Sequence, residues 1–151
     1  GVRLVGSEMC IRDRGNRSLL ADPRGKDIKD KVNKIKHRQE FRPFAPSVLE
    51  EHAHEIFNMP VRKSQFMQFV ADCKYPDKYP AICHIDGTSR VQTVSKQDNP
   101  NYYRLIKEFY KETGCPMVLN TSLNIKGQPI VNDENDAKDF ENRYGVKVFT
   151  K

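Results

Sequence analysis

The sequence contains no tryptophan, and only 37% of its 151 residues are hydrophobic. Its apolar runs are far shorter than the roughly 20 residues that a membrane-spanning helix needs. The N-terminus has no apolar stretch of the kind that a secretory signal contains. Eight phenylalanines and six tyrosines can still supply the core of one domain. The composition therefore predicts a cytoplasmic domain with no membrane partner.

Cysteines are also few. The four in the chain, Cys10, Cys73, Cys83 and Cys115, are widely spaced and form no C-x-x-C motif. Zinc sites and dithiol redox sites usually show such close spacing. The pattern therefore favours buried, reduced thiols over a metal site or a redox pair, and reduced thiols agree with a cytoplasmic location.

Acidic residues are outnumbered by basic ones, 20 against 26, which gives a formal net charge of +6. A basic domain suits either nucleic acid or a small phosphorylated substrate. The basic residues are scattered rather than grouped in blocks, which favours the small substrate and leaves nucleic acid as an alternative. The sequence has no P-loop, so any nucleotide must be held in another way.

Periodicity and capping residues predict that helices and strands alternate. Apolar residues at i, i+4 and i+7 indicate a helix over residues 27–37. Ser47 followed by Glu50 is a capping-box pattern, which predicts a short helix over residues 48–57. The alternation predicts an α/β domain with mixed strand directions. The other expected elements are helices over 99–114 and 134–144 and strands over 64–72, 81–85, 90–95, 117–119 and 146–150.

The densest group of fixed charges is Lys36, Arg38 and Arg42, three cations within seven residues. Pro43 and Pro46 follow, and each proline fixes its own φ at about −65°. Cations on a stiff backbone suit a multiply charged anion, because Arg offers a planar fork for phosphate and Lys a compact charge. The alternative is a solvated helix end, whose dipole also favours cations.

Two polar segments follow later in the chain. Within residues 84–93, Asp86 and Gly87 predict a hairpin turn between two strands, and Arg90 can point from a strand end into a cleft. Residues 120–124, NTSLN, are expected just after a buried strand, and ligands of α/β sheets bind at the carboxyl ends of strands. Their hydroxyl and amide groups can bind phosphate oxygens or a planar carbonyl group. An ordinary turn is the alternative, because these residue types favour turns.

These features occur together and in this order, which resembles the C-terminal domain of the carbamoyltransferase family that includes nodulation protein U and the antibiotic O-carbamoyltransferases. The resemblance covers residues 15–136. It rests on the segments GNRSLLADPR, KDKVNKIKHRQEFRPFAPSVLEE, HIDGTSRVQTV, NPNYYRLIKEFYKETGCPMVLNTSLN and GQPIV. Each segment alone is a weak signal, and together they are specific.

The resemblance implies a protein of two domains. A larger N-terminal domain with an actin-like fold would bind iron and transfer the carbamoyl group to an acceptor hydroxyl. A C-terminal domain with a YrdC-like fold, a twisted mixed sheet flanked by helices, would use carbamoyl phosphate and ATP to make carbamoyl adenylate. Mg²⁺ would travel with the ATP phosphates. The resemblance implies catalytic roles for Lys36, Arg42, Arg90 and Ser122 and substrate binding by Arg12, Arg38, Asn120, Thr121 and Asn124.

The sequence departs from the family at its N-terminus, where it reads CIRDRGNRS instead of the usual GPRALGNRS. Arg12 falls on the family's arginine position. The stretch SEMCIRDR, however, also resembles a peptide that adapter read-through adds to the ends of metagenome-derived proteins. Residues 1–14 are therefore either a non-native or disordered segment, or native sequence, and the doubt concerns residues 6–14 above all. The domain is expected over residues 15–151.

The actin-like domain and its iron ligands are missing from the sequence. The chain is therefore expected to be a fragment that carries out at most the activating half of the reaction, with its own N-terminal domain as a partner. Two alternatives stay open. One is a basic RNA-binding module, because YrdC-like folds also occur in enzymes of tRNA modification, and the other is a catalytically incomplete remnant.

Overall fold

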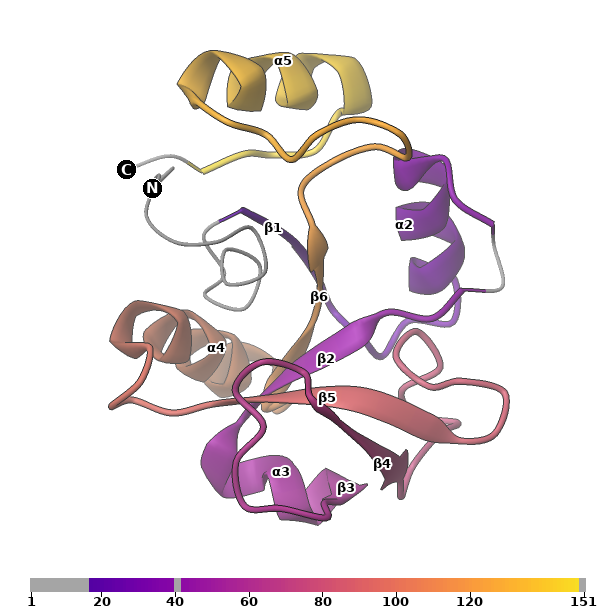
Figure 1. Cartoon of the computed structure of the whole chain (residues 1–151), viewed down its shortest axis with the longest axis vertical. Helices are drawn as coiled ribbons and strands as arrows, with labels where there is room; N and C mark the ends of the chain where they lie inside the picture. The colour runs from indigo at the N-terminus through magenta and orange to yellow at the C-terminus, as the bar shows by residue number, and fades with distance from the viewer. Residues whose placement is uncertain (1–16, 40–41, 150–151) are drawn as a thin grey trace.

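The computed structural model describes residues 17–39 and 42–149 as an α/β fold with one mixed sheet (Figure 1). The strands are β1 (Ser18–Ala21), β2 (Ala45–Leu49), β3 (Phe57–Asn58), β4 (Phe69–Cys73), β5 (Thr88–Val94) and β6 (Met117–Ser122). Their order across the sheet is β1-β6-β2-β5-β4-β3. Strands β2 and β5 are parallel, and the other neighbouring pairs are antiparallel. The predicted α/β class with mixed strand directions is confirmed.

Helices cover both faces of this sheet. They are α2 (Ile28–Lys36), α3 (Ala53–Ile56), α4 (Pro100–Thr113), α5 (Glu134–Tyr144) and the 3-10 helix η2 (Glu50–His52). Adjacent residues of a strand face opposite sides, and Val48 and Leu49 of β2 belong to two separate apolar clusters. The cluster of Leu49 contains Ile106 of α4, whereas that of Val48 contains Val32 of α2 and Phe140 of α5. In the described part of the chain, no helix is long and apolar enough to cross a bilayer.

Capping residues lie at the ends of three helices, close to the ends that the sequence predicts. The side chain of Asn99 accepts a hydrogen bond from a backbone N–H in the first turn of α4, and Asp133 does the same for α5. Gly114, Gly145 and His37 take left-handed conformations after α4, α5 and α2. All three helices are thereby confirmed.

The short helix predicted over residues 48–57 is wrong in its first half. Ser47 caps no helix, because it lies in β2 and its hydroxyl donates a hydrogen bond to the Gln92 side chain of β5. Helical structure begins only at Glu50. Pro46 is compatible with this strand because the pairing of β2 with β5 starts one residue later, at Ser47. Pairing with distant strands has overruled a local capping pattern.

The predicted strands have mixed outcomes. The strand over residues 90–95 is confirmed as β5, which starts two residues earlier and ends at Val94. The strand over 117–119 is confirmed as β6, which extends to Ser122, and the one over 64–72 is regular only from Phe69. Residues 81–85 form turns and irregular structure, and 146–149 form no strand within the described range. Strands β1 and β3 are not predicted from the sequence, because they have only four and two residues and depend on their partners for their extended shape.

An exposed ion pair follows β1 and gives the stability a pH dependence. The Arg24 guanidinium bonds to Asp22 at 2.6 Å and to the Thr113 carbonyl at 2.9 Å, and the first of these hydrogen bonds lowers the pKa of Asp22. A lowered pKa stabilises the fold above the unfolded value, and this stability is lost as the pH falls below about 4. Because the pair is about one-third exposed, we expect less than about 1 kcal/mol. Urea unfolding from pH 7 to pH 3 should show a smaller loss in Asp22→Asn than in the wild type, and equal losses would contradict the assignment.

Candidate functional site

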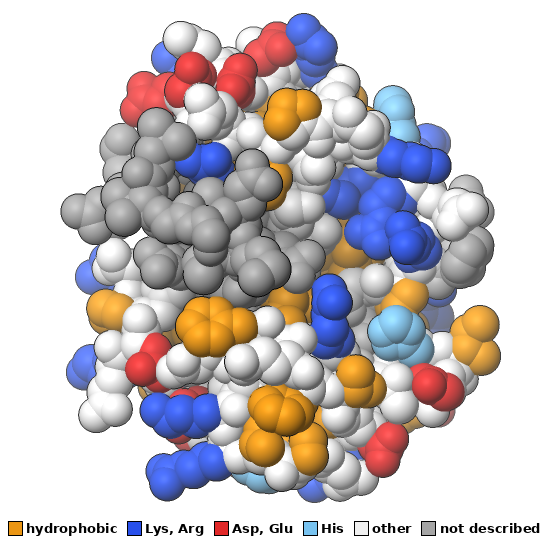
Figure 2. Space-filling model, viewed as in Figure 1, with side chains coloured by type: hydrophobic (Ala, Val, Ile, Leu, Met, Phe, Trp, Pro, Cys, Tyr) orange, Lys and Arg blue, Asp and Glu red, His pale blue; other side chains and the backbone are white. Residues whose placement is uncertain are grey.

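Two adjoining hollows lie where the end of α2 meets β2, β5 and β6. The smaller has a volume of about 190 Å³ and the larger about 720 Å³, and Arg38 and Arg42 line both. Figure 2 shows Lys and Arg side chains gathered on this face, on the side of α2. The structure brings together six of the residues that the sequence predicted for the site. They are Lys36, Ser122 and Asn124 in the smaller hollow, Arg90 in the larger, and Arg38 and Arg42 in both.

Lys36 lies at the C-terminal end of α2, and only 3% of its surface is exposed. Its Nζ donates hydrogen bonds to the backbone oxygens of Ser122 at 2.6 Å and Asn124 at 2.9 Å, and to Asn124 Oδ1 at 3.1 Å. The ammonium group therefore fastens the segment after β6 to the end of α2. It brings a positive charge to the smaller hollow at a fixed position.

The backbone that carries Arg38 and Arg42 is held by bonds back to α2. The N–H of Arg38 donates to the Asn33 carbonyl at 2.9 Å, beside the left-handed His37, and this hydrogen bond closes the helix end. The Asn33 side chain in turn donates to the Arg42 carbonyl at 3.0 Å. The Arg38 guanidinium lies 5.1 Å from the ring centre of Phe44, a cation–π distance. These contacts agree with the stiff frame that the sequence predicts for the cation cluster.

One face of strand β5 runs from the apolar core to the larger hollow. Val94, Gln92 and Arg90 alternate along the strand and therefore share one face. Val94 packs in the apolar cluster under α4. Gln92 is buried and hydrogen-bonded to neighbouring polar side chains, and Arg90 is exposed in the larger hollow. The same face thus changes along one strand from apolar core to buried amide to exposed cation.

The turn before β5 is present, but it does not join the two strands that the sequence predicted. Gly87 has a φ of +79°, and the Asp86 carboxylate accepts hydrogen bonds from the side chain and backbone of Thr88, which lower the pKa of Asp86. The preceding residues are irregular, so the hairpin reading is wrong. Asp86 and His84 both line the larger hollow together with its cations.

The polar segment 120–124 begins inside β6 and not after it, which corrects the predicted boundary. Ser122 and Asn124 are at its open end, where the Ser122 hydroxyl donates to Asn124 Oδ1 at 2.6 Å. Asn124 Nδ2 donates to the Gln128 carbonyl at 2.9 Å. Both side chains line the smaller hollow, so hydroxyl and amide groups lie beside the cations there.

Asn120 and Thr121 lie elsewhere. Asn120 is 1% exposed, and its Nδ2 donates to Ser47 Oγ at 3.1 Å and to Gln92 Oε1 at 3.2 Å. These three side chains from β6, β2 and β5 form what we call the polar trio. Thr121 is buried on the opposite face, paired with Leu19. The structure therefore places neither residue among those that line the two hollows.

Arg17 is a buried cation that the sequence does not single out as a site residue. It precedes β1, is 6% exposed, and its Nε and Nη2 have no hydrogen-bond partner in the chain as the structure describes it. Its carbonyl accepts from the Leu123 N–H at 2.9 Å, so its backbone lies beside the end of β6. The residue was within the quoted motif GNRSLLADPR, but burial cannot be read from a motif. The predicted Arg12 lies outside the described residues.

Metal ligands are not grouped in this part of the chain. Over residues 17–39 and 42–149, no three His, Cys, Asp or Glu side chains lie so that they could hold a metal ion.

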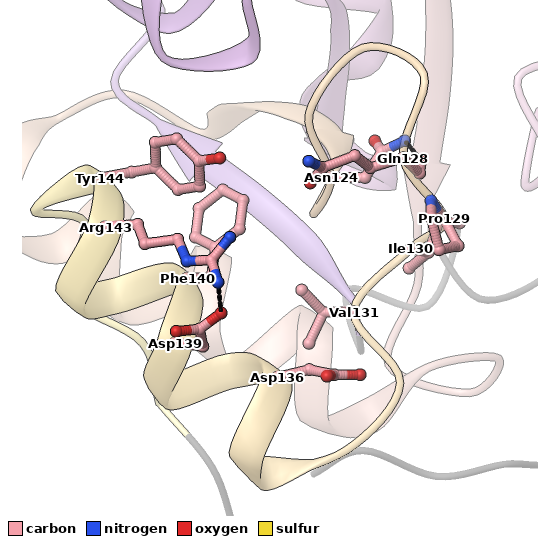
Figure 3. Close-up of a pocket in the computed structure, with 10 residues that line it drawn as sticks. All are labelled: Asn124, Gln128, Pro129, Ile130, Val131, Asp136, Asp139, Phe140, Arg143 and Tyr144. Carbon is pink, nitrogen blue, oxygen red and sulfur yellow. Dashed lines mark hydrogen bonds and ion pairs between the residues drawn. The ribbon is translucent and has the colours of Figure 1, made fainter.

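A third hollow of about 170 Å³ separates α5 from the loop that follows β6 (Figure 3). Asn124 lines both this hollow and the smaller cationic one. On the helix side, Arg143 is paired with Asp139 at 2.9 Å, and Tyr144 contacts Phe140. The paired arginine and the nearby Asp136 make this hollow less cationic than its neighbour.

Comparison with known families gives one match across nearly the whole chain. Residues 3–150 match the family described as Carbamoyltransferase C-terminus. The match extends beyond residues 15–136, which carry the motif resemblance.

Curated relatives agree with this match. The chain is 47% identical to nodulation protein NolO of Bradyrhizobium diazoefficiens over 136 residues, which are 87% of the chain and 25% of that protein. It is 47% identical to the uncharacterized protein MJ1058 of Methanocaldococcus jannaschii, over 86% of the chain and 22% of the relative. Nodulation protein U of Sinorhizobium fredii is 40% identical, over 81% of the chain and 22% of its own length. The chain thus spans about a quarter of the length of these relatives.

Proposed function

Because this chain belongs to the carbamoyltransferase family, as its C-terminal domain, we propose that it binds carbamoyl phosphate and ATP and forms carbamoyl adenylate for transfer to an acceptor hydroxyl. One observation carries the proposal. Cations from two segments far apart in sequence, residues 36–42 with Lys36 and Arg42 and strand β5 with Arg90, converge on two adjoining hollows. Two substrates that both carry phosphate groups need this kind of paired cationic site.

Carbamoyl phosphate would occupy the smaller hollow. Its phosphate suits the guanidinium groups of Arg38 and Arg42, which can bind two oxygens at once. Its planar carbamoyl group suits the hydroxyl and amide of Ser122 and Asn124, which already lie within hydrogen-bond distance of each other. The Lys36 ammonium donates to the Ser122 hydroxyl and to the Asn124 amide oxygen, which holds these two groups in place and adds a positive charge.

ATP would occupy the larger hollow. Arg90 and the shared pair Arg38 and Arg42 offer charges for its phosphates, and Phe44, Val70 and Ile85 offer apolar surface for its base and ribose. The shared arginines would bring the two substrates together.

The proposed chemistry relies on charge more than on covalent help from the protein. Hydrolysis of carbamoyl phosphate gives carbamate and phosphate, and a carbamate oxygen then attacks the α-phosphorus of ATP while the bond to pyrophosphate breaks. Fixed cations stabilise the charge that develops on the leaving pyrophosphate. Magnesium would arrive bound to the ATP phosphates and neutralise part of their charge. Transfer to an acceptor, and any iron chemistry, would belong to the rest of the parent protein.

Isothermal titration calorimetry with carbamoyl phosphate tests this site directly. Arg42→Ala should weaken binding by about 10- to 100-fold, because a charged hydrogen bond contributes about 1.5–3 kcal/mol. Ser122→Ala should weaken it by about fivefold, the equivalent of about 1 kcal/mol. Arg104→Ala is the matched control, because Arg104 is exposed on α4 and lines neither cationic hollow. Absence of carbamoyl phosphate and ATP binding by the intact parent protein would refute the proposal.

The family match does not favour the RNA-binding alternative. The two can be told apart by salt, because binding along an RNA backbone weakens steeply with ionic strength across many phosphates. Carbamoyl phosphate binding should instead saturate at one site per chain.

A further inference from the structure

Two cysteines that are ten positions apart in sequence meet in the fold. Cys73 ends β4, and Cys83 lies in the irregular segment before the turn at Gly87. Ala71 of β4 pairs with Ser89 of β5, and the Ser89 hydroxyl lies 3.7 Å from Cys83 Sγ. Since Cys73 shares a face with Ala71, both sulfurs lie on that side of the sheet. Cys83 packs against the apolar cluster that contains Cys73, and a hydrogen bond between the two thiols lowers the pKa of Cys73 and raises that of Cys83.

Backbone and side-chain bonds fix both members of this pair. The N–H of Cys73 donates to the Gly87 carbonyl at 2.9 Å. The Ser89 hydroxyl donates to the Ile82 carbonyl at 2.8 Å, directly before Cys83. The sequence favoured buried, reduced thiols over a redox pair because the chain has no C-x-x-C motif. Here the loop between β4 and β5 brings the two thiols together without one.

We propose that Cys73 and Cys83 form a dithiol site that a small disulfide oxidant, such as oxidised glutathione, converts reversibly into an intramolecular disulfide. The thiolate of Cys73 attacks one sulfur of the oxidant, the oxidant's S–S bond breaks, and one thiol leaves. The Cys83 sulfur then attacks the mixed disulfide and releases the second thiol. Two protein thiols are oxidised, and one disulfide is reduced to two thiols.

The environments of the two thiols give them different roles in this exchange. The hydrogen bond from Cys83 lowers the pKa of Cys73, which favours its thiolate as the nucleophile. Cys73 is buried, whereas Cys83 is half-buried and gives the pair its contact with solvent. The other cysteine in the described part of the chain, Cys115, is 1% exposed, and burial raises its pKa, so it should react far more slowly.

The pair lies next to the proposed nucleotide site. Cys83 directly precedes His84 and Ile85, which line the larger hollow, while the smaller hollow contains no residue of this segment. A disulfide would tie the segment to the end of β4. It should therefore alter ATP binding and leave carbamoyl phosphate binding unchanged, and this consequence rests on the proposed function.

Thiol mapping of the 151-residue chain tests the dithiol itself. The chain is incubated with oxidised glutathione, alkylated with iodoacetamide under denaturing conditions, and digested for mass spectrometry. We expect the peptides of Cys73 and Cys83 to be joined by a disulfide, and dithiothreitol to restore both thiols. Cys115 should take the alkyl group in both cases. Glutathione adducts without the joined peptides, or two thiols that stay unmodified, would overturn the proposal.

Single variants and calorimetry complete the test. Cys73→Ser and Cys83→Ser should each prevent the crosslink, and the remaining cysteine of the pair should stop at a glutathione adduct or stay reduced. The oxidised wild type should bind ATP with an affinity at least threefold different from that of the reduced protein. Equal affinities would refute the link to the larger hollow. A failure of the reduced protein to bind ATP would count against the proposed function, whereas the crosslink would still establish the dithiol.

Discussion

Replacing Lys36 with methionine is expected to lower the free energy of unfolding by about 3 kcal/mol and to abolish measurable carbamoyl phosphate binding. The substitution keeps an unbranched side chain as far as Cε but removes the Nζ donor. The carbonyls of Ser122 and Asn124 then lose a donor in a place where little water can replace it. The segment after β6 also loses its bond to α2. Urea unfolding and calorimetry measure the two effects separately.

Lys34→Met is the matched control for this change. Lys34 lies in the same last turn of α2 and is exposed, so its replacement removes a charge of the same sign from the same helix end. We expect a change of less than about 0.5 kcal/mol in the control. Equal stability of the two variants would show that the buried bonds of Lys36 contribute nothing to the fold.

Replacing Asn120 with alanine is expected to lower the free energy of unfolding by about 2 kcal/mol and to change carbamoyl phosphate affinity by less than about threefold. The amide belongs to the polar trio, and its loss removes one buried donor from Ser47 Oγ and one from Gln92 Oε1. Asn120 lines neither cationic hollow. Chemical unfolding and calorimetry on the same preparation distinguish a structural role from a role in binding.

Asn124→Ala supplies the comparison, because Asn124 is the same residue type four positions further on and lines the smaller hollow. We expect it to weaken carbamoyl phosphate binding more than tenfold. If Asn120→Ala instead lost binding while its stability stayed at the wild-type level, Asn120 would be a substrate contact, as the family resemblance implies.

The helices could be predicted from the sequence because their signals are local. Asn99, Asp133 and the glycines at 114 and 145 act within one turn of the helix that they cap. The strands could be predicted less well, because their shape depends on partners far away. Ser47 is typical of a helix start, yet its hydroxyl bonds to Gln92, 45 residues later.

The same contrast between local signals and distant partners decides which site residues could be predicted from the sequence. The cations at 36, 38 and 42 form a local motif, and the sequence was enough to group them. Asn120 and Ser122 lie in one polar segment, but only the strand's position in the sheet shows that Asn120 is buried with its neighbours while Ser122 reaches the hollow. Burial of Arg17 depends on how the chain packs around the start of β1, which no pattern of residue types reveals.

The place of β6 in the sheet bears on how the chain folds as it is synthesised. Strand β6 lies between β1 and β2, and it pairs Ser18 with Ser122 and Ser47 with Val118. The first two strands therefore cannot complete their pairing until most of the chain has left the ribosome. Contacts so distant in sequence slow folding, because a long loop must close before they form. The cationic hollows, which need α2 and β6 together, should accordingly be among the last parts of the domain to take shape.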